Sequence, residues 1–293
     1  MPMAELRRRA GEFLLSRVAG DDHGPRIERI WGTPGERTYG PSDPIWHVNQ
    51  DPSMYTGGVC ALFLQSLHPG PMAAVATYAD YQADPWARLQ QISFHIAITT
   101  FATAEDAEKQ FALVRAVHSH INGVDDFGNS YRADDPELLR WVHDAETWSF
   151  LTSYQRWGRG HLTDAECDTY VRQSAEGGRR LGATDLPETF AELEAQLEAF
   201  RPALACTPAA LDVVDFLTHR APLPAYAKPG YQMVIEGGKS LLPAWARQML
   251  DLPTDSRTRR RQRALGHAAT RLVGWALGGA QPSAVSPPGS SSR

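Results

Sequence analysis

One histidine of this chain lies within an apolar stripe that would bury it inside the molecule. Between residues 103 and about 122, apolar side chains recur at spacings of four, three, four and three, the pattern of one helix face. The stripe consists of Ala107, Phe111, Val114, His118 and Ile121. A neutral imidazole in an apolar helical pocket is a common axial ligand of heme iron. The alternative is a core histidine whose ring bonds to a carbonyl or a carboxylate.

A second histidine is followed, one helical turn later, by a carboxylate. His143 and Glu146 lie in an expected helix that opens with Asp134-Asp135-Pro136 and runs to about Trp157. The two side chains could form an oriented pair for proton transfer, or a buried structural pair. Together with another histidine such as His68, they could instead form a non-heme metal site. A di-iron bundle would require Glu-x-x-His on two helices, whereas this chain has only the reversed order.

Several common catalytic motifs are absent from the sequence. It contains no HExxH, no GxSxG and no GxGxxG, which argues against zinc proteases, serine hydrolases and dinucleotide-binding enzymes. Gly238-Lys239-Ser240 resembles the end of a phosphate-binding loop, but Met233 occupies the position of the first glycine. We therefore interpret this segment as a loop before a helix.

Helical periodicity covers most of the chain, and the alternation typical of strands is absent. The predicted fold class is all-α, with a single large helical domain and no internal repeat. Residues 20–57 are rich in Gly, Pro and Asp, and we expect an irregular arm held on the core by Trp31, Tyr39 and Trp46. The expected helices are 60–67, 72–81, 85–100, 103–122, 134–157, 163–181, 187–200, 208–217, 243–250 and 256–277.

Composition excludes several classes of protein. Apolar residues make up 42% of the 293 residues, which excludes a wholly disordered chain. The net charge of −5 offers no basic face for nucleic acid, and we interpret the arginine-rich segment 257–263 as a solvated helix face. Three scattered cysteines indicate neither a disulfide framework nor a structural zinc site. No apolar run suits a membrane span and no clean export signal follows the N-terminal arginines, so we expect a cytoplasmic protein.

Short segments in a characteristic order suggest a family. They are WHVN (46–49), GG (57–58), LQSLHP (64–69), ADPWARL (83–89), FATAEDAE (101–108), VRAVH (114–118), YRADDPELLRWVH (131–143), PLP (222–224) and LLP (241–243). In this order they resemble the DUF2236 family, also called the MpaB-type oxygenase family, which includes the latex clearing proteins, heme b dioxygenases. The resemblance covers roughly residues 45 to 275.

The resemblance implies an all-helical fold with a globin-like core that holds heme b. It implies that His118 is the proximal iron ligand, and the apolar stripe independently turns this residue toward the core. Arg115, in the same motif, would pair with a heme propionate or fix the imidazole, unless it is a surface arginine. Arg88 matches a family arginine in or near the heme pocket, where it could meet a propionate or polarise bound oxygen. The implied organisation is an N-terminal helix and irregular arm packed on the core (1–44), a DUF2236-like helical heme domain (45–280) and a disordered tail (281–293).

The chain also departs from the family pattern. The family usually continues from the arginine matched by Arg88 with a basic residue and a threonine, and this chain has Gln91 and Ile92 there. Asn122 stands where an arginine often follows the ligand histidine. Ile92 would line a pocket with altered polarity, and rubber cleavage is therefore not expected.

His68 and His143 match histidines that recur in the family. Each could be an acid or base on the distal side, a second axial ligand or a structural hydrogen bonder, and for His68 the simple alternative is a helix cap. The predicted function is a heme b-dependent oxidoreductase or oxygenase that acts on a small organic substrate with dioxygen or peroxide, and with a possible electron donor. The alternatives are a non-enzymatic heme sensor or carrier, a non-heme metal enzyme using His143 and Glu146, and a helical interaction module without a cofactor.

Overall fold

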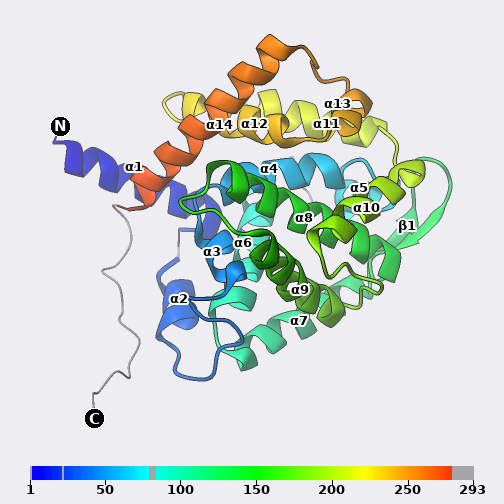
Figure 1. Cartoon of the computed structure of the whole chain (residues 1–293), viewed down its shortest axis with the longest axis horizontal. Helices are drawn as coiled ribbons and strands as arrows, with labels where there is room; N and C mark the ends of the chain where they lie inside the picture. Colours follow the sequence, from blue (N-terminus) through cyan, green and yellow to red (C-terminus); the bar gives the residue numbers. More distant parts are fainter. Residues whose placement is uncertain (1, 22, 79–83, 279–293) are drawn as a thin grey trace.

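The computed structural model describes residues 2–21, 23–78 and 84–278, and within these residues it confirms an all-α fold of one domain (Figure 1). The α-helices are α1 (Met3–Ala19), α2 (His23–Ile27), α3 (Pro44–Gln50), α4 (Met54–Gln65), α5 (Pro69–Tyr78), α6 (Pro85–Phe101), α7 (Ala104–His118), α8 (Pro136–Trp157), α9 (Asp164–Leu181), α10 (Phe190–Ala199), α11 (Pro208–Asp215), α12 (Lys228–Leu241), α13 (Ala244–Met249) and α14 (Ser256–Leu277). Short turns of other helix types are η1 (Glu28–Gly32), η2 (Arg201–Ala203) and η3 (Phe216–Arg220), and a two-stranded antiparallel hairpin is formed by β1 (Asn122–Val124) and β2 (Ser130–Arg132).

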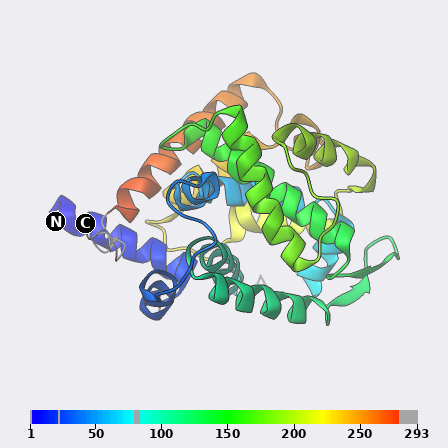
Figure 2. The same cartoon turned by 60° about the horizontal axis from the view of Figure 1, so that its bottom comes forward.

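Helix α8 is the centre of the hydrophobic core, with Trp141 and Leu151 fully buried. Helix α4 packs closely along α8 because Gly57 has no side chain: a Cβ there would lie 3.1 Å from the carbonyl oxygen of Ser149. Helices α12 and α14 lie at one end of the molecule and α7 at the other (Figures 1 and 2). Helix α1 packs against both α6 and α14, so the N-terminal helix forms part of the same body.

Capping residues fix the helices that later present the site. The Thr103 side chain accepts a hydrogen bond from the backbone N–H of Asp106 and starts α7, as the sequence predicted. Asp135 accepts from the backbone N–H groups of Glu137 and Leu138 and starts α8, where Pro136 occupies the first turn. These two caps fix where α7 and α8 begin, and both helices line the cavity described below.

The prediction for residues 238–240 is wrong, because they lie inside α12 rather than in a loop before a helix. The glycines serve close packing: a Cβ on Gly237 would lie 2.7 Å from the Cα of Gly266 in α14. A Cβ on Gly238 would lie 2.5 Å from Cγ1 of Val59 in α4. Lys239 is buried and its Nζ lies 3.0 Å from Oε1 of Glu236. The segment is therefore a packing surface between helices.

Helix α7 also ends earlier than predicted, at His118 rather than near residue 122. The chain turns there and enters the hairpin, in which Gly123 pairs with the buried Tyr131. Strands of three residues are too short to show alternation in the sequence, which explains why the hairpin was not predicted. The residues just after His118 therefore leave the helix.

The N-terminal arm is more ordered than the predicted irregular segment, since it contains α2, η1 and α3. The Trp31 ring stacks on Phe101 at 5.1 Å, and Trp46 meets the same ring edge-on at 4.9 Å. The hydroxyl of Tyr39 donates to the Gln173 carbonyl. The tail predicted at 281–293 and the end of the helix predicted at 72–81 lie outside the described residues.

No single helix in the described part of the chain has both the length and the apolar character that a membrane span requires. Helices α4 and α5 meet those criteria as a pair that is bent by 106°.

Candidate functional site

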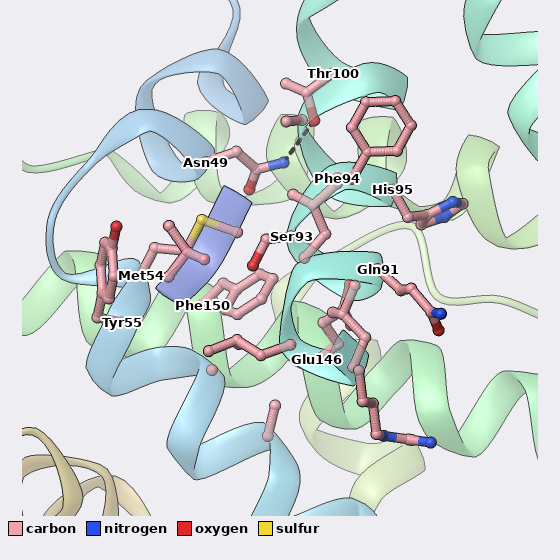
Figure 3. A pocket seen from close by; sticks show the side chains of 18 of the residues that line it. Asn49, Met54, Tyr55, Gln91, Ser93, Phe94, His95, Thr100, Glu146 and Phe150 are labelled. Atoms are coloured by element: carbon pink, nitrogen blue, oxygen red, sulfur yellow. Dashed lines mark hydrogen bonds between the residues drawn. The ribbon is translucent and has the colours of Figure 1, made fainter. Parts of the chain in front are cut away.

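A large cavity of about 2260 Å³, partly open to the surface, lies among α1, α4, α6, α7, α8, α9, α12 and α14. Most of the wall surface is apolar, and histidine, arginine, amide, hydroxyl and carboxyl side chains also reach it. In Figure 3 the side chains of Gln91 and His95 extend from α6 to one side, while Asn49, Met54 and Tyr55 approach from the other. The volume exceeds the ~300–1,000 Å³ of a typical small-ligand pocket, so the cavity can hold a large cofactor with room beside it.

His118 reaches this cavity from the last turn of α7, as the apolar stripe predicted. The side chain is half-buried, and its Nδ1 is buried without a hydrogen-bond partner among the described residues. Burial lowers the pKa of His118, an effect that Asp134 opposes and Arg88 reinforces. The imidazole is therefore held in its neutral form, which is the form that binds a metal.

Arg88 reaches the cavity from the first turns of α6. Burial lowers the pKa of its guanidinium, and no ion pair or hydrogen bond to this group is found within the described ranges. Gln91 and Ile92, the departures from the family pattern, line the same cavity. An unpaired cation in a mainly apolar wall suits a ligand that carries a carboxylate.

His95 is a residue of the cavity wall that the sequence analysis did not select. It lies on α6, and its ring meets Phe111 edge-to-face with centroids 5.7 Å apart. Its Nδ1 is buried without a partner in the described part of the chain. Burial, with a smaller contribution from His118, lowers its pKa to about 4. Its position one turn after Ile92 and two turns after Arg88 is the sequence signal that could have identified it.

His143 and Glu146 both line the cavity but do not bond to one another. The His143 ring is held instead by neighbours on α8: Nδ1 lies 3.0 Å from Oδ1 of Asp144, and Nε2 lies 3.3 Å from Oγ1 of Thr147. Burial raises the pKa of Glu146 to about 7, against an opposing influence of His143. The carboxylate that bonds to His143 is therefore Asp144 and not the predicted Glu146, which is a separate carboxyl group of the wall.

Two predicted site residues lie away from this cavity wall. His68 sits between α4 and α5, where its Nδ1 accepts a hydrogen bond of 3.3 Å from the backbone N–H of Gly70. Arg115 lies on the outer face of α7 with 43% of its side chain exposed, donates to the Arg180 carbonyl and pairs with Glu108. These positions match the alternatives named in the sequence, a structural role at a helix end for His68 and a surface position for Arg115.

The described residues contain no group of three or more His, Cys, Asp or Glu side chains arranged to hold a metal ion. His143 and Glu146 share the cavity, but His68 does not join them there. The non-heme metal site considered from the sequence therefore lacks its third ligand among these residues.

The fold and the cavity define a helical protein with a large, mainly apolar cavity into which histidine, arginine and carboxyl groups project. A family model described as "ER-bound oxygenase mpaB/B'/Rubber oxygenase, catalytic domain" matches residues 45–275, and the chain belongs to this family. No curated protein and no solved structure matches the chain. The family resemblance noted in the sequence is confirmed, and membership in an oxygenase family supports an enzymatic activity with dioxygen and a small-molecule substrate.

The residues of the cavity fit heme b. The cofactor would need an axial nitrogen ligand, and His118 offers a neutral imidazole that reaches the cavity. It would also bring carboxylate side chains, which could pair with the Arg88 guanidinium, a group without an ion pair among the described residues. A mainly apolar wall suits the remainder of the porphyrin.

Proposed function

We propose that the chain is a heme b-dependent oxygenase in which His118 is the proximal ligand of the iron. The observation that carries this proposal is the presence, in one mainly apolar cavity, of the neutral His118 imidazole and of the Arg88 guanidinium, which has no partner in the described part of the chain. Heme b would supply the electron chemistry with dioxygen or peroxide, and the protein would supply the ligand, the orientation and the shielding from water.

Each cavity residue has a distinct part in this proposal. Arg88 would pair with a propionate and so fix the orientation of the cofactor. Glu146 is suited to hold or release a proton at its carboxyl oxygens near neutral pH, because burial raises its pKa to about 7. His143, fixed by Asp144 and Thr147, is the other group in this wall that can exchange a proton. His68 and Arg115 receive no part in it, because both lie away from the cavity wall.

We infer a small organic substrate of mainly apolar character, since apolar side chains form most of the wall. The apolar surroundings would hold such a molecule by burial and would exclude water from it. Turnover would also need an external electron donor if the reaction requires reducing equivalents.

The test is an ultraviolet–visible spectrum of the purified full chain, oxidised and dithionite-reduced, together with a pyridine hemochrome assay. The proposal predicts a Soret band and about one heme b per chain. A colourless protein that cannot be reconstituted with hemin would contradict it.

A second candidate function is a non-enzymatic heme sensor or carrier. The observation that favours it is His95, which offers a second imidazole in the cavity of His118. A heme whose two axial positions were both filled would have no open position for dioxygen. This function predicts a spectrum that neither dioxygen nor peroxide changes, whereas the oxygenase predicts a change with at least one of them.

A further inference from the structure

Helix α1 forms one wall of the cavity with a single face. Leu6, Ala10, Phe13 and Arg17 recur at spacings of four, three and four along the helix, and all four residues line the cavity. The helix packs on α6 and on α14, and Figure 1 shows it beside the C-terminal end of α14. The family model matches residues 45–275, so this wall comes from a segment outside the match. Membership in the family therefore does not explain it.

The charged residue of this α1 face, Arg17, is held between two aromatic rings. Its guanidinium carbon lies 5.1 Å from the centroid of the Phe13 ring and 5.4 Å from that of the Trp86 ring on α6. Its Nε is buried, and the side chain has neither a hydrogen bond nor an ion pair within the described ranges. The ring faces attract the cation but leave its N–H donors without an acceptor oxygen. An unpaired buried donor is costly, so this arrangement indicates an anionic partner that arrives with a ligand.

Arg17 and Arg88 belong to different sides of α6. Trp86, which contacts the Arg17 guanidinium, precedes Arg88 by two positions, and residues two apart point to nearly opposite sides of a helix. Arg88 lies close enough to His118 on α7 to disfavour protonation of that imidazole and so to lower its pKa. The two guanidinium groups therefore serve different parts of the cavity, and a ligand of Arg17 is not the group that Arg88 would hold.

The wall around the α1 face is apolar and continues to the surface. The Phe13 ring meets the Tyr226 ring edge-on, with centroids 5.7 Å apart, and Leu277 of α14 also lines this part of the cavity. Leu6, Tyr226 and Leu272 line the cavity and are also exposed at the surface. An apolar chain can therefore enter beside α1 and remain in contact with apolar side chains.

We propose that the α1 side of the cavity is a binding subsite for a long-chain organic acid. Arg17 pairs with the carboxylate, since its planar guanidinium matches the two carboxylate oxygens. The apolar chain lies against Phe13 and the facing residues of α12 and α14. The inference deepens the proposed function, and it rests on that function only in taking the bound acid as the substrate.

Isothermal titration of the purified full chain at pH 8 tests the subsite with two probes, dodecanoate and dodecan-1-ol, which have the same chain length and differ in charge. Arg17→Met keeps an unbranched apolar side chain between the rings and removes the charge, whereas Arg17→Lys keeps the charge. Arg9→Met is the matched control, because Arg9 lines the same wall but already pairs with Glu5 at 2.7 Å.

We expect the affinity for dodecanoate to fall about 10- to 100-fold in Arg17→Met, to fall less in Arg17→Lys and to stay unchanged in Arg9→Met. The affinity for dodecan-1-ol should be the same in all four proteins, which also shows that the variants are folded. In the wild type, affinity should rise about 4-fold for each methylene between octanoate and dodecanoate, because each added methylene is buried.

Three results would overturn the proposal. The first is equal affinity of the wild type and Arg17→Met for dodecanoate, and the second is octanoate binding as tightly as dodecanoate. The third is a lower heme content in Arg17→Met with unchanged affinity for dodecanoate, which would assign Arg17 to the cofactor. A chain that binds dodecanoate as expected but binds no heme would support the subsite and contradict the proposed function alone, so the two failures are distinguishable.

Discussion

Replacing Glu146 by glutamine removes a titratable carboxyl group from the cavity wall and changes little in shape. Burial raises the pKa of Glu146 from its ordinary value of 4.5 to about 7. At about 1.36 kcal/mol per pH unit, the ionised side chain destabilises the fold by about 3 kcal/mol, or by about 2 kcal/mol if water in the cavity solvates it.

The direction of the pH dependence follows from proton linkage. The unfolded chain releases the Glu146 proton near pH 4.5, whereas the folded chain keeps it until about pH 7. The contribution of this group to the free energy of unfolding therefore falls between those two pH values and stays low above pH 7. Glu146→Gln lacks the carboxyl group, so its advantage over the wild type should be near zero at pH 4 and should reach about 2 to 3 kcal/mol at pH 8.

Urea unfolding of the purified chain from pH 4 to pH 8.5, in the same heme-free state throughout, measures this difference. Glu194→Gln is the matched control, because Glu194 is exposed on α10 and should change the free energy by less than about 0.5 kcal/mol at any pH. If the free energies of unfolding of the wild type and of Glu146→Gln changed with pH in parallel, the reasoning would be refuted. Such a result would show that Glu146 ionises as easily in the folded chain as in the unfolded one.

Two further changes test the cofactor site and the helix packing. Arg88→Leu should weaken heme b binding about 10- to 100-fold in a hemin titration, because a charged hydrogen bond is worth about 1.5–3 kcal/mol. Arg115→Ala should leave the affinity unchanged, because its guanidinium already bonds on the surface; equal losses in the two variants would contradict this assignment. Gly237→Ala should lower the free energy of unfolding by about 1–3 kcal/mol, since its Cβ would lie 2.7 Å from the Cα of Gly266. Gly24→Ala is the control, because nothing lies within 4 Å of its Cβ, and equal stability of both alanine variants would count against the close approach of α12 and α14.

Local signals in the sequence predicted the parts of the fold that local interactions determine. The starts of α7 and α8, at residue 103 and at Asp134-Asp135-Pro136, were predicted because a side chain and the next backbone N–H groups are sufficient to form the caps found there. Helix α12 was not predicted, since Gly237 and Gly238 weaken any local helix signal. The packing that stabilises them in a helix comes from α14 and α4, which are distant in the sequence.

The same distinction explains which site residues could be predicted. The apolar stripe was enough to turn His118 inward, because helical periodicity is local. The outward direction of Arg115 depends on the Arg180 carbonyl at the end of α9, and no spacing within α7 reveals that partner. His95 was missed for a related reason: its role as a cavity residue appears only when α6 and α7 are placed around one space.

Heme retention in two histidine variants tests most directly whether His118 holds heme b. His118→Ala removes the proposed ligand, and His120→Ala changes an exposed histidine two residues later. The proposal predicts that His118→Ala loses the Soret band while its far-ultraviolet circular dichroism stays helical, and that His120→Ala keeps about one heme per chain. Stoichiometric heme with an unchanged spectrum in His118→Ala would contradict it.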